Sequence, residues 1–280
     1  MGHRHKARKA ERLARTSNPL DIAVAGRDGA VLAMVDRAVR AGDTLLAFQP
    51  VVQALRPDRV AFHEGLIRVL DETGRIIPAA EFILKIEERE TGRIIDCLAL
   101  EMGLRALAEE PSLRLSINMS ARSIGYPRWM RSLERGLRRD ETAAERLILE
   151  ITESSAMMVP ELVVAFMNEI QAKGVSFALD DFGAGYTSFR YLKQFSFDIL
   201  KIDGQFVRGV ATDPDNQVLA QALQMIARQF DMFTVAEGVE RAEDAAWLAR
   251  EGLDCLQGYY FGAPTTMPPW RDTAKEQETA

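Results

Sequence analysis

Cysteine and histidine are scarce in this sequence, which has 2 cysteines and 3 histidines among 280 residues. Cys97 and Cys255 are far apart and have no ligand-like spacing, so we interpret both as buried thiols of a reducing compartment. His3 and His5 lie in a basic stretch whose spacing does not favour metal binding. His63 follows a strand pattern that directs it away from its neighbour Glu64, so we expect a packed or hydrogen-bonded histidine rather than a ligand.

The sequence also lacks long apolar runs and an excess of positive charge. No apolar segment approaches the length of a transmembrane helix, and the N-terminus has no apolar signal-peptide core. We therefore expect no membrane span and a cytoplasmic location. The net charge is −6 and the isoelectric point is about 5.3, which argues against a general affinity for nucleic-acid polymers or membrane surfaces. An acidic protein that acts on an anionic substrate needs metal cations or a few well-placed basic residues.

The sequence does have the size and apolar content for a large core. It has 280 residues, of which 47% are hydrophobic. Residues 1–15 form a basic arm, which we interpret as a solvated and poorly ordered tail. We predict an N-terminal arm over residues 1–27, one folded domain over 28–272 and a short tail over 273–280.

Strand and helix patterns alternate along the predicted domain. A helical pattern covers residues 30–40 and ends at Gly42. Strand patterns cover residues 45–52, 61–69, 113–119, 147–152, 175–180, 199–203, 233–237 and 255–260. Helical patterns between them are clearest at 94–107, 160–173, 186–193, 216–230 and 242–251. Eight strands that alternate with helices predict a (β/α)8 or TIM barrel. A doubly wound open sheet is the alternative, but no G-x-G-x-x-G motif follows an early strand.

The stretch over residues 175–185 ends a strand in two adjacent carboxylates and a glycine turn. Apolar and small or polar residues alternate up to Asp180, which is typical of a strand with one buried face. Asp180 and Asp181 would point to opposite faces of a strand, and the turn after them would let both face one ligand. Because two close carboxylates repel each other, one interpretation is a metal site. The other is an Asp-rich turn that caps the next helix.

Polar side chains end seven of the predicted strands. These residues are Glu64, Asn118, Glu150, Asp180, Asp181, Lys201, Glu237 and Gln257. We expect them to gather, because the carboxyl ends of barrel strands form one mouth. Their hard oxygen donors favour Mg²⁺ or Mn²⁺ over zinc, and their number implies two ions that share a bridging aspartate. Such a site suits hydrolysis at phosphorus, so the residues predict a metal-dependent phosphodiester or phosphate hydrolase.

Several spaced motifs give most of the chain a family resemblance. They are Glu64-Gly65-Leu66-Ile67-Arg68, Asn118-Met119-Ser120, Glu150-Ile151-Thr152-Glu153, Asp180-Asp181-Phe182-Gly183-Ala184-Gly185, Lys201-Ile202-Asp203, Ala236-Glu237-Gly238-Val239-Glu240 and Gln257-Gly258-Tyr259. The pattern resembles the EAL-domain family of cyclic di-GMP phosphodiesterases. The resemblance implies an α/β fold that is a modified TIM barrel with an antiparallel first strand. It also implies hydrolysis of cyclic di-GMP to linear pGpG with two Mg²⁺ or Mn²⁺ ions.

The resemblance implies six metal ligands. One ion would be held by Glu64, Asn118, Glu150 and Asp180, and Asp180 would bridge to a second ion held with Asp181 and Glu237. Glu64 and Glu237 would also belong to the catalytic set.

Five further positions match family residues around the reaction. Lys201 would contact the attacking water, and Gln257 would help to fix that water or the substrate, so both join the catalytic set. Gln49 and Arg68 would touch the nucleotide, with Arg68 near a phosphate. Glu153 would stabilise the loop that follows the aspartate pair.

One position departs from the family pattern, because Gly65 stands where the motif has alanine. A glycine at a strand end adds backbone freedom worth up to about 1 kcal/mol, which would loosen the placement of Glu64 and slow the reaction. The departure leaves open a catalytically weak or inactive receptor that binds cyclic di-GMP and acts through a protein partner. A barrel metalloenzyme for another phosphoester is a third hypothesis. The resemblance further implies a homodimer through the loop and helix after Asp181, where Phe189 and Leu192 are candidate contacts.

Overall fold

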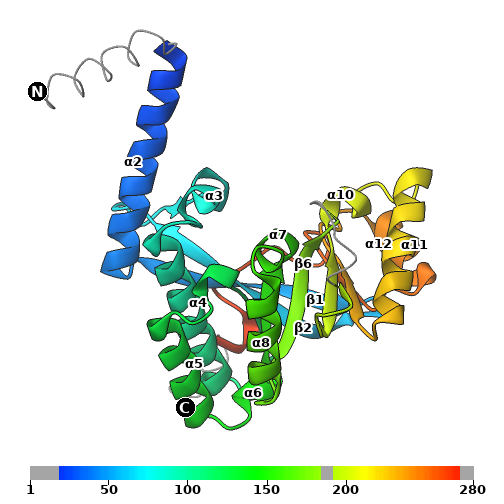
Figure 1. The fold of residues 1–280 in the computed structure, drawn as a ribbon. Helices are drawn as coiled ribbons and strands as arrows, with labels where there is room; N and C mark the ends of the chain where they lie inside the picture. Colours follow the sequence, from blue (N-terminus) through cyan, green and yellow to red (C-terminus); the bar gives the residue numbers. More distant parts are fainter. Residues whose placement is uncertain (1–18, 184–191, 272–280) are drawn as a thin grey trace, which may run out of the picture.

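The computed structural model describes residues 19–183 and 192–271 of the chain (Figure 1). Within this part, eight strands close into a barrel in the order β1–β9–β8–β7–β6–β5–β4–β2, and β2 pairs with β1 to complete the ring. They are β1 (Thr44–Gln53), β2 (Arg56–Leu70), β4 (Leu115–Asn118), β5 (Leu147–Thr152), β6 (Ser176–Phe182), β7 (Ile199–Ile202), β8 (Phe233–Ala236) and β9 (Cys255–Gln257). A short strand, β3 (Ile76–Ile77), pairs with β2 outside the ring. The eight predicted strands and the TIM barrel are confirmed.

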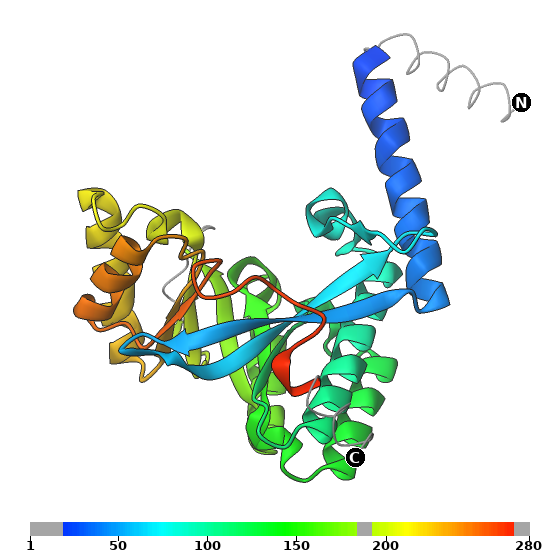
Figure 2. The ribbon, with the colours of Figure 1, turned by 180° about the vertical axis from the view of Figure 1, so that it is seen from behind.

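The first strand of the barrel runs against the others. β1 and β2 form an antiparallel hairpin in which Gln49 lies opposite Glu64. β1 is also antiparallel to β9, where Val51 lies opposite Gln257. The remaining neighbours around the ring are parallel. The fold is therefore a modified TIM barrel with an antiparallel first strand, and Figure 2 shows the long β1–β2 hairpin crossing the molecule.

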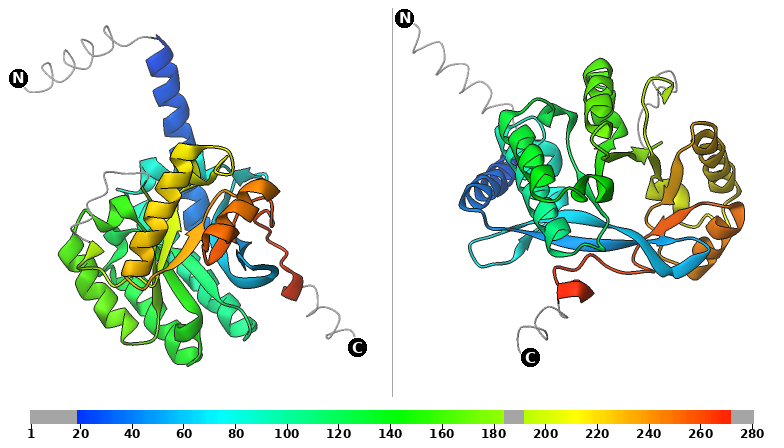
Figure 3. Two further views of the ribbon diagram at one scale, coloured as in Figure 1. Left: turned by 90° about the vertical axis from the view of Figure 1, so that its right-hand side faces the viewer. Right: turned by 90° about the horizontal axis from the view of Figure 1, so that it is seen from below.

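Helices cover most of the outside of the barrel (Figure 3). They are α4 (Glu90–Glu109), α5 (Pro127–Arg139), α6 (Ala143–Arg146), α7 (Glu153–Ala156), α8 (Pro160–Gln171), α10 (Gly204–Val207), α11 (Pro214–Gln229) and α12 (Ala242–Glu251). Proline opens α5, α8 and α11, where a first-turn N–H would have no partner inside the helix. Gly252 ends α12 in the left-handed conformation with φ 84°. Residues 186–191 of the helix predicted over 186–193, including Phe189, lie outside the described residues.

The C-terminal segment covers the hairpin side of the barrel in place of a helix (Figure 3, right). Phe48 and Thr265 exchange two backbone hydrogen bonds of 2.8 and 3.0 Å. The Trp270 ring lies 5.3 Å from the Phe48 ring and 4.7 Å from the His63 ring, edge to face. Burial lowers the pKa of His63 to about 4, so its ring is neutral near pH 7. The prediction of a packed histidine is confirmed.

The apolar core has one part outside the strands and one part inside the barrel. The outer part lies between strands and helices and includes Trp129, Phe166 and Phe177, whose rings follow one another at 5.6 and 5.8 Å. The inner part consists of Val51, Phe62, Ile148, Ala178, Ile199 and Val235. Because side chains alternate across a strand, the same strands supply both parts.

A long helix, α2 (Pro19–Ala41), extends away from the barrel (Figures 1 and 2). Near its C-terminal end, Val35 and Val39 pack with Val69 of β2 and Ile86 of α3 (Ile83–Ile86). The helix predicted over residues 30–40 is confirmed, although it begins at Pro19, within the residues assigned to the N-terminal arm. The basic stretch over residues 1–15 lies outside the described residues. Among the helices that the structure describes, none combines the length and apolarity needed to cross a membrane.

Candidate active site

A buried lysine lies among four carboxylates at the mouth of the barrel. Lys201 is fully buried, and its Nζ lies 2.7 Å from both Glu150 Oε2 and Glu237 Oε1. The same atom lies 3.1 Å from Asp180 Oδ1 and 3.3 Å from Glu64 Oε2. These carboxylates belong to β2, β5, β6 and the residue that follows β8. The expectation that polar strand ends meet at one mouth therefore holds for these residues.

Strand alternation explains why the polar residues converge. Glu150 of β5 lies between Leu149 and Ile151, which are directed to the outer core, so its own side chain faces the barrel interior. Lys201 of β7 lies in the same way between Leu200 and Ile202. Each strand thus buries apolar side chains against helices and places a polar side chain at the mouth.

Amide side chains orient the carboxylate of Glu64. Asn118 Nδ2 donates to Glu64 Oε1 at 2.8 Å, and Gln257 Nε2 donates to Glu64 Oε2 at 2.6 Å. Gln257 Nε2 also lies 3.2 Å from Gln49 Oε1, and Gln49 Nε2 donates to the carbonyl of Gly262 at 3.1 Å. Three predicted amide residues are therefore part of one hydrogen-bonded network around Glu64.

Asp181 joins the cluster through its own backbone conformation. Its φ of 54° lies in the left-handed region, which is uncommon for residues other than glycine. Carboxylate oxygens of Asp180, Asp181 and Glu237 lie within 4.8 Å of one another. We expected the necessary rotation in the glycine turn after the aspartates, and the structure corrects this because the rotation occurs at Asp181 itself, inside β6, where the register with β7 is irregular.

Glu153 connects the ends of β5 and β6. The backbone N–H of Gly183 donates to Glu153 Oε2 at 3.1 Å, and the Glu153 side chain is buried. Gly183 has φ 96°, and a methyl group there would lie 2.6 Å from the Phe206 ring, so both conformation and space require glycine. This contact agrees with the loop-stabilising role expected for Glu153. Residues 184–191 of that loop lie outside the described residues.

The carboxylates and Lys201 strongly shift one another's pKa values. Burial alone would lower the pKa of Lys201, but the carboxylates of Asp180, Glu150, Glu237 and Glu64 raise it well above its ordinary value. Burial acts to raise the pKa of Glu64, and Lys201 together with the amide donors outweighs it, so this pKa is lowered. Burial and nearby negative charge raise the pKa of Glu150 well above its ordinary value. Lys201 thus stays charged, and Glu64 is its ionised partner.

The site has more negative charge than Lys201 can balance. Burial, and then the neighbouring aspartate, raises the pKa of Asp181 to about 6. Burial raises the pKa of Glu237 to about 8 despite its contact with Lys201. The five carboxylates of the cluster carry four negative charges beyond the one that the lysine neutralises, when all are ionised. Further cations would relieve this imbalance.

Unsatisfied oxygens in the site fit a divalent metal ion. Within the described part of the chain, Glu150 Oε1 and Gln257 Oε1 are buried and receive no hydrogen bond, and the buried Asp180 Oδ1 has the Lys201 ammonium 3.1 Å away as its ion-pair partner. Buried polar atoms without a partner cost free energy, which a bound cation would recover. All three are hard oxygen donors, which Mg²⁺ and Mn²⁺ prefer. The residues present therefore fit the predicted metal ions.

A cavity of about 370 Å³ opens above the cluster. Its lining includes Gln49, Glu64, Asp181, Glu237, Gln257, Asp203, Arg208, Glu240 and Tyr259. Arg208, whose Nε lies 3.4 Å from Glu240 Oε1, is a lining residue that was not predicted from the sequence. The available signal was its position in the loop after β7, since loops after barrel strands build the mouth. Arg68 is not part of this lining, and its Nη1 donates to the carbonyl of Ile67 at 3.2 Å.

Comparison with known proteins agrees with this geometry. Residues 32–264 match the family model described as the EAL domain. The chain belongs to the EAL domain family. Cyclic di-GMP phosphodiesterase PdeF of Escherichia coli (strain K12) is 31% identical over 253 residues, which cover 89% of this chain and 33% of PdeF. The chain thus spans about a third of the length of this curated relative.

Solved structures of other EAL proteins have the same fold. The PaMucR phosphodiesterase in a c-di-GMP complex superposes with a TM-score of 0.72 and 29% identity, covering 84% of this chain and 97% of that chain. Klebsiella pneumoniae BlrP1, in a manganese and cy-diGMP complex, gives a TM-score of 0.70 and 26% identity, covering 80% and 56% of the two chains. The barrel with its antiparallel first strand is therefore the EAL fold.

Proposed function

We propose that this chain is a metal-dependent phosphodiesterase that hydrolyses cyclic di-GMP to linear pGpG. The observation that carries the proposal is the convergence of five carboxylates and one buried lysine at the mouth of an EAL barrel. The names of the relatives support the substrate, since PdeF is a cyclic di-GMP phosphodiesterase and the PaMucR structure holds c-di-GMP. In this reaction water adds to one phosphorus and one P–O bond breaks, which opens the cyclic dinucleotide.

Two divalent ions, Mg²⁺ or Mn²⁺, would balance the four excess negative charges of the site. We assign as their ligands Glu64, Asn118, Glu150, Asp180, Asp181 and Glu237. When bound, the ions supply an activated water and stabilise charge on the leaving oxygen. The buried oxygens without hydrogen bonds support this assignment, as does the manganese in the BlrP1 complex.

The other polar residues of the mouth handle water and substrate. Lys201 donates from a buried position at the centre of the carboxylates, which suits it to orient the attacking water and to offset charge on a phosphoryl oxygen. Gln257 and Gln49 form one hydrogen-bonded pair beside Glu64, where they would fix the water and the nucleotide. Arg68 would reach a phosphate from outside the described lining of the mouth.

Purified protein should be incubated with cyclic di-GMP in the presence of Mg²⁺, Mn²⁺ or chelator, with products followed by chromatography. We expect pGpG only with metal ion, and a loss of about 100-fold or more in Glu64→Gln, because both oxygens of Glu64 are engaged at the site. Glu161→Gln, on the exposed side of α8, is the matched control. Binding of cyclic di-GMP without product would favour the receptor, and turnover of another phosphoester would favour a different metalloenzyme. Normal turnover in Glu64→Gln would contradict the assigned role.

The assembly and the cellular location are also proposals. A homodimer through the loop and helix after Asp181 would involve residues 184–191, which lie outside the described residues. The expected contact through Leu192 is wrong, because this side chain is 3% exposed and packs in the core. Sedimentation of the purified chain at several concentrations tests it, and a monomer at all concentrations would contradict it. A cytoplasmic location agrees with the two free thiols, Cys97 and Cys255.

A further inference from the structure

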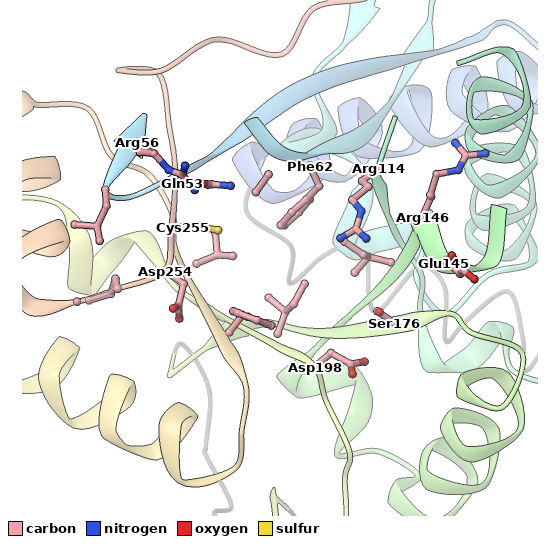
Figure 4. Close-up of a pocket in the computed structure, with 18 residues that line it drawn as sticks. Gln53, Arg56, Phe62, Arg114, Glu145, Arg146, Ser176, Asp198, Asp254 and Cys255 are labelled. Atoms are coloured by element: carbon pink, nitrogen blue, oxygen red, sulfur yellow. The ribbon is translucent and has the colours of Figure 1, made fainter. Parts of the chain in front are cut away.

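A second cavity, of about 570 Å³, opens at the opposite end of the barrel from the carboxylates (Figure 4). Its walls come from the first residues of the parallel strands, such as Ser176, Ile199, Phe233 and Cys255, and from the turn between β1 and β2. A volume of this size lies within the range of small-molecule sites, roughly 300–1,000 Å³. The proposed phosphodiesterase reaction makes no use of this cavity.

One layer of apolar side chains separates the two cavities. We call this layer the plug, and it consists of Val51, Phe62, Ile148, Ala178, Ile199 and Val235. Its members lie two residues from site residues on the same strands, as in the pairs Phe62 and Glu64, Ile148 and Glu150, Ile199 and Lys201, and Val235 and Glu237. Residues two apart on a strand face the same side, so the plug is the floor of the active site and one wall of the second cavity.

The rim of the second cavity carries two arginines that the fold does not use. Among the described residues, Arg56 and Arg114 are exposed and form no ion pair. Asp198 and Asp254 lie on the opposite side of the cavity (Figure 4), and each accepts a backbone N–H at 2.8 Å from the start of a neighbouring strand. Glu145 is an exposed carboxylate of the rim. The β1–β2 side of the cavity is therefore the side that can receive an anion.

We propose that this cavity binds a small amphipathic anion, with its apolar body against the plug and its anionic group beside Arg114. Burial of an apolar body against Phe62 and Ile148 is favourable in proportion to the area removed from water. A guanidinium group suits a carboxylate because it offers paired N–H donors. The occupant would touch the same strands that carry Glu64 and Glu150, at the opposite end from the carboxylates.

The two cysteines allow a direct test with decanoate as the probe. Cys255 lines the cavity, whereas Cys97 on α4 is fully buried. Burial raises the pKa of Cys255 to about 11, so alkylation with iodoacetamide is followed at pH 9 by mass spectrometry. We expect decanoate to slow alkylation of Cys255 by about fivefold or more, and decyltrimethylammonium to leave it unchanged, because the rim selects an anion.

Two arginine variants test whether protection by decanoate depends on the cavity rim or on positive charge elsewhere on the surface. Arg114→Gln should raise the decanoate concentration for half-protection about tenfold, as for one lost charge-assisted hydrogen bond. Arg131→Gln, an exposed position on α5 that does not line the cavity, should leave it unchanged. The proposal would be overturned by equal protection from the cationic detergent or by no protection from decanoate. It would also be overturned if Arg114→Gln left the decanoate concentration for half-protection unchanged. Alkylation of Cys97 in the presence of decanoate would also overturn it, because it would show that decanoate unfolds the chain. Since the assay needs neither metal ion nor turnover, its result is independent of the proposed phosphodiesterase function.

Discussion

The glycine of the Glu-Gly-Leu motif lies against a side chain that fills the space of the missing methyl group. A Cβ built on Gly65 would lie 2.6 Å from Ile117 Cδ1 and 3.2 Å from Leu46 Cδ2. On its other side, Ile117 lies against Gly103 of α4, where a Cβ would meet Cδ1 at 2.7 Å. Ile117 therefore occupies a slot between two glycines. The φ of Gly65 is not positive, so the backbone conformation permits alanine, and the obstacle is crowding, chiefly by Ile117 and less by the Ser116 carbonyl oxygen at 3.2 Å.

This geometry gives a magnitude for Gly65→Ala. Carbon atoms pack at about 3.5–4.0 Å, so Ile117 would have to move by about 1 Å toward the backbone at Gly103. Overpacking of this kind costs about 1–3 kcal/mol, whereas replacing a strand glycine with alanine gains about 0.5–1 kcal/mol. We expect Gly65→Ala to lower the free energy of unfolding by about 1 kcal/mol.

Ile117→Val removes the methyl group that would clash with alanine at position 65. Alone, Ile117→Val should lower the free energy of unfolding by about 1 kcal/mol, since it leaves a small cavity. In the double variant the new alanine fills this cavity, so the two changes should cost about 1 kcal/mol less together than the sum of the single variants. Urea denaturation of the four proteins in a double-mutant cycle measures this coupling. Additive effects would refute the reasoning.

The same variants test whether Gly65 affects Glu64. The Glu64 carboxylate is held by Asn118 and Gln257 and by the charge of Lys201, none of which depends on a methyl group at position 65. We therefore expect the double variant to keep the proposed turnover of cyclic di-GMP within about threefold of the parent, which is below 1 kcal/mol. A large gain in turnover would show that glycine does loosen Glu64, as expected from the sequence.

Three further predictions concern the charges around the mouth. Lys201→Met should lower the free energy of unfolding by about 3 kcal/mol in chelator, because it leaves buried carboxylates without a cation. Added Mn²⁺ should restore this stability, and an equal loss of melting temperature with and without Mn²⁺ would contradict the prediction. Glu153→Ala should weaken Mn²⁺ binding about tenfold through loss of the Gly183 hydrogen bond, whereas Glu161→Ala should not, as titration calorimetry would show. Asp96, half-buried on α4, has a pKa raised from 3.8 to about 6, chiefly by burial. Asp96 holds its proton more tightly in the folded protein than in the unfolded chain. The free energy of unfolding should therefore fall by up to about 3 kcal/mol as the pH rises from about 4 to 6. Asp96→Asn should flatten this fall in denaturation curves, and an unchanged slope would disprove the assignment.

The strands and most of the site could be predicted because one local rule places them. Alternation fixes which residues face the barrel interior, and the barrel brings the carboxyl ends of its strands to one mouth. Glu64, Glu150, Asp180, Lys201 and Glu237 meet for this reason. No long-range information beyond the strand order was needed for these residues.

Other features depend on tertiary contacts that no local pattern records. The left-handed φ of Asp181 occurs where β6 is irregular against β7. Aspartate enters this region more often than most residues, but no local pattern marks which aspartate does so. The first part of α2, from Pro19, is separated from the pattern over residues 30–40 by Gly26 and Gly29, which have low helix propensity. Arg208 enters the mouth from a loop, and loop conformations follow their surroundings more than their own sequence.

The plug keeps water from reaching the carboxylates of the mouth through the second cavity. Charges in the mouth would be screened if water reached them from below, and the excess carboxylates could then remain ionised without added cations. Phe62, Ile148 and Val235 close that side with buried apolar side chains, so the field of the carboxylates is directed to the open mouth. Divalent cations and a phosphodiester that they help to bind are the partners suited to such a field. A polar substitution in the plug, such as Val235→Thr, is therefore expected to weaken Mn²⁺ binding although it touches no carboxylate, and unchanged Mn²⁺ affinity in calorimetry would show that the mouth does not depend on the plug.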